Sequence, residues 1–142
     1  MHVSDSKKYQ PAKMETLDFP KNHQRLMPYL VMKDADRFIR FMQDVFGAKE
    51  KMNYKPDGKI IAHAELSIGE SVIMFSGDTT QLEPCTIGGF IYVADADETY
   101  KKAIDSGAIG VMPIKESPFG RSGGFTDPFG NTWWVKAYRS TE

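Results

Sequence analysis

The chain of 142 residues has 18 Lys and Arg residues against 19 Asp and Glu residues, a formal net charge of −1, and 41% hydrophobic residues. This length suits one domain or two tightly joined half-domains, and a balanced charge without a basic block argues against a nucleic-acid partner. No apolar run is long enough to span a bilayer, and the N-terminal residues lack a signal-peptide pattern. The single cysteine, Cys85, excludes an intrachain disulfide and agrees with a cytoplasmic location.

The first half of the folded region is expected to contain one helix and four strands. Residues 1–24 are polar, contain Pro11 and Pro20, and are predicted to form an arm or tail outside the core. In the region 25–77 we expect a strand, a helix and three strands, at 26–32, 34–46, 49–54, 60–68 and 71–76. Asp34 is predicted to cap the helix and Gly47 to end it.

The same order of elements returns in the second half. A linker at 78–87 leads into the region 88–138, and residues 139–142 are a short tail. The elements expected there are again a strand, a helix and three strands, at 89–94, 95–106, 111–116, 122–126 and 131–138. Asp95 or Asp97 is predicted to cap this helix and Gly107 to end it. Each half therefore reads β-α-β-β-β.

Short motifs support a duplication of one half-domain. Matched segments recur at a spacing of roughly 60 residues, longer than the usual solenoid periods. The matches are Lys33-Asp34-Ala35-Asp36 with Ala94-Asp95-Ala96-Asp97, Phe46-Gly47-Ala48 with Ser106-Gly107-Ala108, and Ile68-Gly69-Glu70 with Phe129-Gly130-Asn131. The motif Asp127-Pro128-Phe129-Gly130 is a turn that leads into a strand containing Trp133 and Trp134.

These residues resemble the vicinal oxygen chelate superfamily, which includes glyoxalase I, extradiol dioxygenases, and fosfomycin and bleomycin resistance proteins. The PhnB-like, glyoxalase-like group is the most similar branch. The matching residues are Pro28-Tyr29-Leu30, Phe41, Val45-Phe46-Gly47-Ala48, Asp57-Gly58, His63-Ala64-Glu65-Leu66, Tyr92-Val93, Asp95-Ala96-Asp97, Gly107-Ala108, Gly120-Arg121 and Asp127-Pro128-Phe129-Gly130. The resemblance implies an α+β fold in which two βαβββ modules pair into an eight-stranded, partly open barrel-like sheet with helices outside. It also implies a homodimer with a site on the concave face.

The resemblance also indicates which positions would hold the family's metal ion. Metal-using members carry four ligands, and the equivalent positions here are Met27, Ile73, Gly88 and Trp134. None of these suits a hard or borderline divalent cation, so we expect no metal and no other cofactor. The alternative is a divalent metal held by a displaced set of ligands.

One polar pair stands out among the predicted strands. His63 and Glu65 are two residues apart on a strand and therefore share a face, which makes them candidate catalytic residues. The competing interpretation is a polar pair on a solvated or dimer-facing surface. The other histidines, His2 and His23, lie in the arm and are given no role.

The remaining site candidates would line an apolar pocket. They are Met27, Tyr29, Ile73, Phe75, Phe90, Tyr92, Phe119, Arg121, Phe125 and Trp134. Met and aromatic side chains suit a planar apolar ligand, although the same pattern is typical of an ordinary core. Arg121 lies in a glycine-rich segment that we predict to be a mobile lid, where it could clamp a carboxylate or phosphate or simply be a surface residue.

The favoured hypothesis is a metal-free, homodimeric small-molecule-binding protein of unknown ligand, without nucleic-acid or membrane partners. The first alternative is an enzyme, namely a lyase, isomerase, epimerase or dioxygenase that uses a divalent metal. Further alternatives are a bleomycin-type antibiotic-binding resistance protein and a scaffold that binds nothing. Whether a reaction is catalysed, and whether the modules pair within one chain or across two, stays open.

Overall fold

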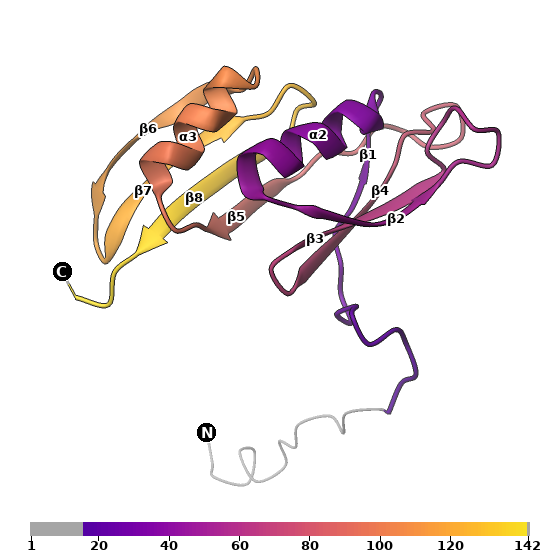
Figure 1. The fold of residues 1–142 in the computed structure, drawn as a ribbon, viewed down its shortest axis with the longest axis horizontal. Coiled ribbons are helices and arrows are strands. Elements are labelled where there is room, and N and C mark those ends of the chain that lie inside the picture. Colours follow the sequence, from indigo (N-terminus) through magenta and orange to yellow (C-terminus); the bar gives the residue numbers. More distant parts are fainter. Residues whose placement is uncertain (1–15, 142) are drawn as a thin grey trace, which may run out of the picture.

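The computed structural model describes residues 16–141, so residues 1–15 of the predicted arm lie outside the described part. Module one comprises β1 (Tyr29–Val31), α2 (Ala35–Phe46), β2 (Lys49–Tyr54), β3 (His63–Ile68) and β4 (Ser71–Ser76). Module two comprises β5 (Gly88–Tyr92), α3 (Ala96–Asp105), β6 (Ile109–Ser117), β7 (Gly120–Thr126) and β8 (Thr132–Tyr138) (Figure 1). The predicted α+β class and the two βαβββ modules are confirmed.

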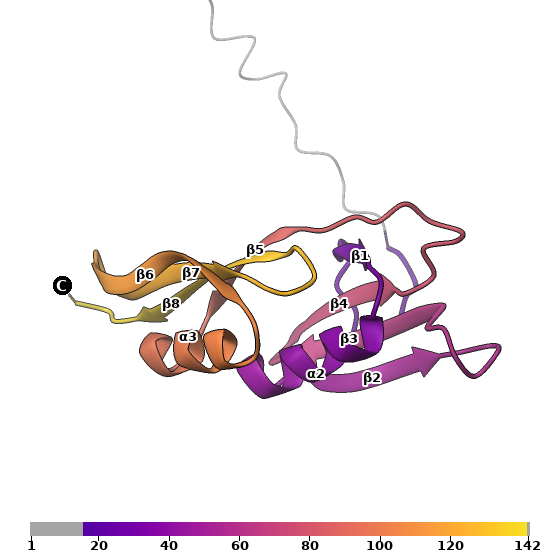
Figure 2. The same ribbon diagram turned by 90° about the horizontal axis from the view of Figure 1, so that it is seen from above.

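The strands form two four-stranded sheets with the same topology. Their orders are β1-β4-β3-β2 and β5-β8-β7-β6. In each sheet the first strand of the module pairs in parallel with the last, and the other neighbours are antiparallel. The sheets lie toward opposite ends of the long axis (Figure 2) and do not close into a barrel.

The two modules pack through their helices and the turn before β8. Helices α2 and α3 lie next to each other (Figures 1 and 2). Phe129 of module two makes edge contacts with Phe38 and Phe41 of α2, at centroid distances of 5.7 and 6.4 Å. At the other end of α2, Phe46 contacts Trp133 of β8 at 5.7 Å. One hydrophobic core therefore continues from one module into the other.

The helix ends agree with the sequence at three of four predicted positions. Gly47 adopts a left-handed conformation with φ 67° at the end of α2, and Gly107 follows α3. Asp95 caps α3, since its side chain accepts a hydrogen bond from the Glu98 N–H at 3.0 Å. The prediction for Asp34 was wrong: its φ of 58° is left-handed and its side chain makes no capping bond. A side-chain cap requires extended backbone at that position.

Two strands of module one begin later than predicted. β1 begins at Tyr29 instead of Leu26, so Met27 precedes the strand. β3 begins at His63 because the preceding residues belong to a turn organised by Asp57, whose carboxylate accepts hydrogen bonds from the N–H groups of Lys59 and Ile60. These backbone donors are thereby used locally instead of in the sheet.

The predicted lid is part of a sheet. The segment from Gly120 to Gly124 belongs to β7, which lies between β6 and β8. Its glycines make room for neighbouring side chains: a Cβ on Gly124 would lie 2.4 Å from Cε3 of Trp134. Glycine content here reflects close packing and not mobility. Within the described residues, no helix combines the length and the hydrophobicity needed to cross a membrane.

Candidate functional site

Each sheet has one face against the helices and one face turned away from them. On the helix side of module one, Leu30 pairs with Phe75 and Leu66 pairs with Ile73, and all four side chains are buried in the core. In module two the buried Phe125 pairs with Trp133 on the helix side. The structure therefore places three of the predicted ligand-binding residues, Ile73, Phe75 and Phe125, in the core and away from the open faces.

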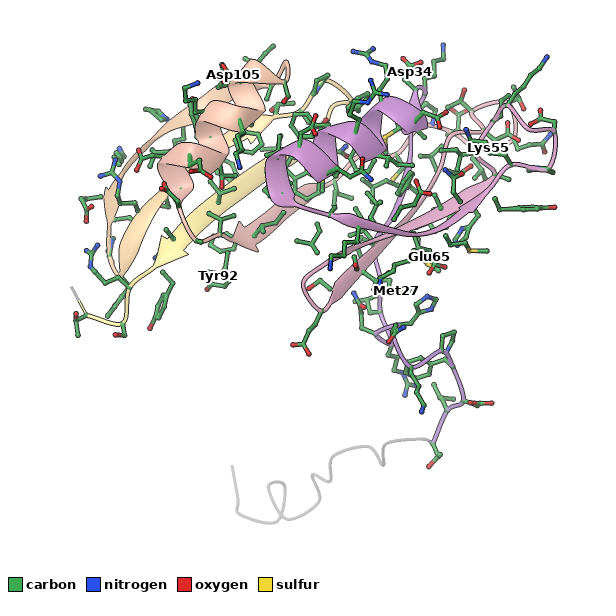
Figure 3. The ribbon with its side chains drawn as sticks, viewed as in Figure 1. Met27, Asp34, Lys55, Glu65, Tyr92 and Asp105 are labelled. Carbon is green, nitrogen blue, oxygen red and sulfur yellow. The ribbon has the colours of Figure 1, made fainter. Side chains whose placement is uncertain are left out.

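The open face of module two carries a row of exposed aromatic side chains. Their exposed fractions are 56% for Phe90, 67% for Tyr92, 42% for Phe119 and 61% for Tyr138. Tyr92 contacts Phe90 at a centroid distance of 5.2 Å and Tyr138 at 6.3 Å, and Tyr138 stacks with Phe119 at 6.4 Å. We call these four residues the aromatic row. Tyr92 projects away from α3 (Figure 3), and with Val93 and Tyr138 it lines a shallow depression of about 410 Å³.

Trp134 lies on the same face as the aromatic row. It pairs with Phe90 on β5 and with Gly124 on β7, and is partly buried. The absence of a side chain at Gly124 lets the indole lie close to β7. Trp134 is thus positioned to report on anything bound to the aromatic row.

Arg121 lies on the opposite face. It pairs with Ala137 on the helix side of the sheet, and its Nε and Nη2 donate to Asp97 of α3 at 2.8 and 3.1 Å. Nη1 donates to Glu116 at 3.2 Å. The hydrogen bonds to Asp97 raise the pKa of Arg121 and lower that of the Asp97 carboxyl. The structure therefore does not bring Arg121 to the aromatic row, and its donors are already directed at two carboxylates.

A second cluster of polar groups lies on module one, around Glu65. The side chain of this residue is only 11% exposed. His23 Nε2 lies 2.7 Å from one carboxylate oxygen and His63 Nε2 lies 3.0 Å from the other. Tyr29 Oη is 3.3 Å from His63 Nδ1, and the two rings stack at 5.7 Å. We call Tyr29, His63, Glu65 and His23 the Glu65 cluster; Figure 3 labels Glu65 on the sheet of module one.

The Glu65 cluster favours one pattern of protons. Burial by itself would raise the pKa of Glu65, but the hydrogen bonds from His63 and His23 outweigh it and leave the pKa below its ordinary value. An ionised carboxylate only accepts hydrogen bonds, so Nε2 carries a proton in both imidazoles. In neutral His63 the remaining nitrogen, Nδ1, then accepts from the Tyr29 hydroxyl. Partial burial raises the pKa of Tyr29, which keeps this phenol a donor.

Sequence reasoning found His63 and Glu65 but missed His23. Its position in the arm, 42 residues from Glu65, carries no periodic signal that would connect the two. The arm is held beside the sheet by a second bond, in which Gln24 Nε2 donates to the Val72 carbonyl at 2.9 Å. The tertiary structure therefore adds His23 to the cluster.

A polar cavity of about 650 Å³ lies beside the Glu65 cluster, between the arm and sheet of module one. The arm contributes Lys21 and His23 to its wall, and β2 contributes Lys49 and Lys51. The volume falls in the range of small-molecule sites. The cavity differs from the aromatic row in lying on the other module and in having a charged lining.

The residues at the family's metal positions do not fit a metal ion. Met27, Ile73, Gly88 and Trp134 offer no carboxylate or imidazole. Among residues 16–141, no group of three or more His, Cys, Asp and Glu side chains is arranged to hold a metal. We therefore derive no chemistry from a family-type metal centre.

Residues 22–135 match the family model described as Glyoxalase/Bleomycin resistance protein/Dioxygenase superfamily. The chain belongs to this superfamily. No curated protein sequence matches the chain. The assignment agrees with the two βαβββ modules and with the resemblance noted from the turn motifs.

Several solved structures share the fold at low sequence identity. TioX from Micromonospora sp. ML1 is 23% identical, with a TM-score of 0.66, over 81% of this chain and 98% of TioX. A PhnB protein from Bacillus cereus is 15% identical, with a TM-score of 0.64, over 80% of this chain and 99% of its own. The fosfomycin resistance protein FosX from Listeria monocytogenes is 18% identical, with a TM-score of 0.59, over 90% of this chain and 97% of FosX. At these identities the likeness concerns the fold and not the activity.

Proposed function

We propose that this protein binds a planar, largely apolar small molecule on the aromatic row of module two, without a metal ion. The observation that carries the proposal is the continuous contact among four aromatic side chains that are each more than two-fifths exposed. Aromatic rings that remain exposed next to one another form an apolar patch, and such patches mark interaction sites. Ring faces and edges of this kind favour stacking with a planar ligand.

We further propose that a second copy of the chain completes the site. The open face of module one in the partner would cover the aromatic row, so that a homodimer encloses two equivalent cavities. Two observations support this arrangement: the two sheets are not hydrogen-bonded to each other within the chain, and each has a face turned away from the helices. A symmetric dimer that exchanges complementary faces closes with no face left over.

The chemistry of the aromatic row favours a neutral ligand. Its four members are aromatic, and the ammonium group of Lys136, which pairs with Tyr92 on the same face, is directed at the Pro118 carbonyl. A large cationic drug such as bleomycin would instead need an acidic groove. Sequestration of such a drug is therefore the less favoured alternative. A metal-dependent reaction is also less favoured, because no suitable ligand set exists among the described residues.

Fluorescence of Trp134 provides the test. We expect 2-naphthol, which is planar, to quench the fluorescence saturably and cyclohexanol, which is not planar, to have no effect. Tyr92→Ala should weaken 2-naphthol binding by about tenfold, the loss of roughly one aromatic contact. Ile104→Ala is the control, because Ile104 is an apolar side chain that is 40% exposed on α3, on the helix side of the sheets. Equal weakening in both variants, or no saturable quenching, would refute the proposal.

A further inference from the structure

We infer that the polar cavity of module one is a second binding site, for a small organic acid that carries a hydroxyl beside its carboxylate. The site is formed where the arm residue His23 meets Glu65 and where lysines of β2 line the same cavity. This inference does not rest on ligand binding at the aromatic row, because the two sites use different residues. In the homodimer proposed above, the face of module one that carries this cavity meets the partner's aromatic row, so the two ligands are tested separately.

The charge of the cavity wall favours an anion. Lys21, Lys49 and Lys51 line it, and none of the three forms an ion pair with a residue among 16–141. These ammonium groups outnumber the two carboxylates of the wall, Glu65 and Glu70. Glu65 is already compensated by two imidazoles. A ligand carboxylate therefore finds cations whose charge is not taken up by the protein's own described acids.

His23 supplies an acceptor for the ligand hydroxyl. Its Nε2 is committed to Glu65 at 2.7 Å, and its Nδ1 makes no hydrogen bond with any described residue. With the proton on Nε2, neutral His23 has a lone pair on Nδ1. The carboxylate behind the ring holds this tautomer and the ring orientation in place, as carboxylates do behind metal-bound histidines.

The other half of the cluster fixes the position of Glu65. His63 holds the second carboxylate oxygen at 3.0 Å and is itself held by the Tyr29 hydroxyl. The carboxylate is therefore bound on both sides and cannot rotate freely away from His23. His63 and Tyr29 are positioning residues in this arrangement, and His23 is the group that meets the ligand.

The hydroxyl requirement can be tested with two dicarboxylates that differ by one group. L-malate carries a hydroxyl beside a carboxylate, and succinate lacks it. By isothermal titration calorimetry of the full-length protein at pH 7.5, we expect malate to bind with a Kd below about 1 mM and succinate to bind about tenfold more weakly. His23→Phe should remove this difference by weakening malate binding to the level of succinate.

The role of the lysines is tested separately. Lys49→Gln combined with Lys51→Gln should weaken malate and succinate by the same factor, about tenfold. The matched control is Lys101→Gln combined with Lys102→Gln, which removes the same charge from exposed positions on α3. Should the His23 variant fold poorly, the imidazole ¹⁵N signals of the wild-type protein replace it: malate should shift Nδ1 of His23, and succinate should not.

Three outcomes would overturn the inference. The first is no saturable malate binding by the wild-type protein. The second is equal affinity for malate and succinate, which would remove the role of His23. The third is equal weakening of malate binding by the Lys49/Lys51 variant and by the Lys101/Lys102 variant. The loss would then come from the lower net charge of the protein and not from contacts in the cavity. Retention of 2-naphthol binding in any of these cases would leave the proposal for the aromatic row intact.

Discussion

Asp127 and Trp133 are joined by a buried hydrogen bond, in which the indole Nε1 donates to the Asp127 carboxylate at 2.8 Å. The same carboxylate accepts from the backbone N–H groups of Phe129 and Asn131 and from the Asn131 side chain. Asn131 in turn accepts from the Ile87 N–H just before β5. The Asp-Pro-Phe-Gly-Asn turn thus connects three strands of module two. The motif is therefore typical of the fold and does not indicate a particular reaction.

Replacing Asp127 should therefore destabilise the protein strongly. Asp127→Ala leaves four donors without their acceptor, and Asp127 is only 4% exposed, so we expect a loss of about 3 kcal/mol in the free energy of unfolding. Urea denaturation followed by Trp fluorescence measures it. Asp105→Ala is the control, since Asp105 forms only an exposed ion pair with Lys101 and should change stability by less than about 0.5 kcal/mol. Similar losses in both variants would contradict the structural role of the turn.

Gly124→Ala should alter the aromatic face directly. A methyl group there would lie 2.4 Å from the Trp134 ring and must displace the indole, at an expected cost of about 1–3 kcal/mol. Binding of 2-naphthol should weaken at the same time. Gly88→Ala is the matched control, because Gly88 lies on β5 with nothing within 4 Å of an added Cβ. Thermal unfolding measures the change in stability, and the quenching titration measures the change in affinity. If Gly124→Ala changes neither quantity, Trp134 is not held against β7.

The Glu65 cluster should make stability depend on acid pH. The folded-state pKa of Glu65 is lowered, so its contribution is complete above the ordinary carboxyl pKa of about 4.3 and is lost as pH falls through the lower folded value. In Glu65→Gln this part of the pH dependence should be absent. The measurement is the difference in unfolding free energy between wild type and variant from about pH 6 to pH 3. A constant difference across this range would show that Glu65 has no shifted pKa.

Arg121 should be dispensable for ligand binding. Because its guanidinium faces α3 and pairs with Asp97 and Glu116 at exposed positions, Arg121→Gln should change stability little and leave 2-naphthol binding unchanged. The same quenching titration tests this. A marked loss of affinity for 2-naphthol would show that Arg121 takes part in ligand binding.

Local patterns predicted the elements well because their causes are local. The spacing of Phe38, Phe41, Met42 and Val45 placed one apolar face on α2, and these residues are buried as expected. Gly47 ends that helix and Asp95 caps the next because backbone conformation and a side chain three residues away decide these features. The prediction for Asp34 was wrong because the turn before α2 imposes a left-handed backbone at this residue. The identity of the side chain does not reveal that conformation.

Which face of a strand meets the helices could not be predicted in the same way. Residues of β4 alternate between two faces, and both faces carry apolar side chains, so the pattern does not tell whether Ile73 and Phe75 or Val72 and Met74 lie under α2. For the segment that carries Arg121, the prediction of a mobile lid was wrong, because its glycines belong to a strand. Once β7 is paired with β8, the alternation of side chains places Arg121 on the helix side.

The sequence by itself determined the two βαβββ modules, three of their four helix ends and the family, because these depend on periodicity, turn chemistry and motifs of a few residues. Only the tertiary structure decided that four aromatic side chains meet on one open face and that His23 reaches Glu65, which is 42 positions away in the sequence. Strand register and the path of the arm bring these groups together. Both depend on packing across the whole chain, which no short segment of the sequence specifies.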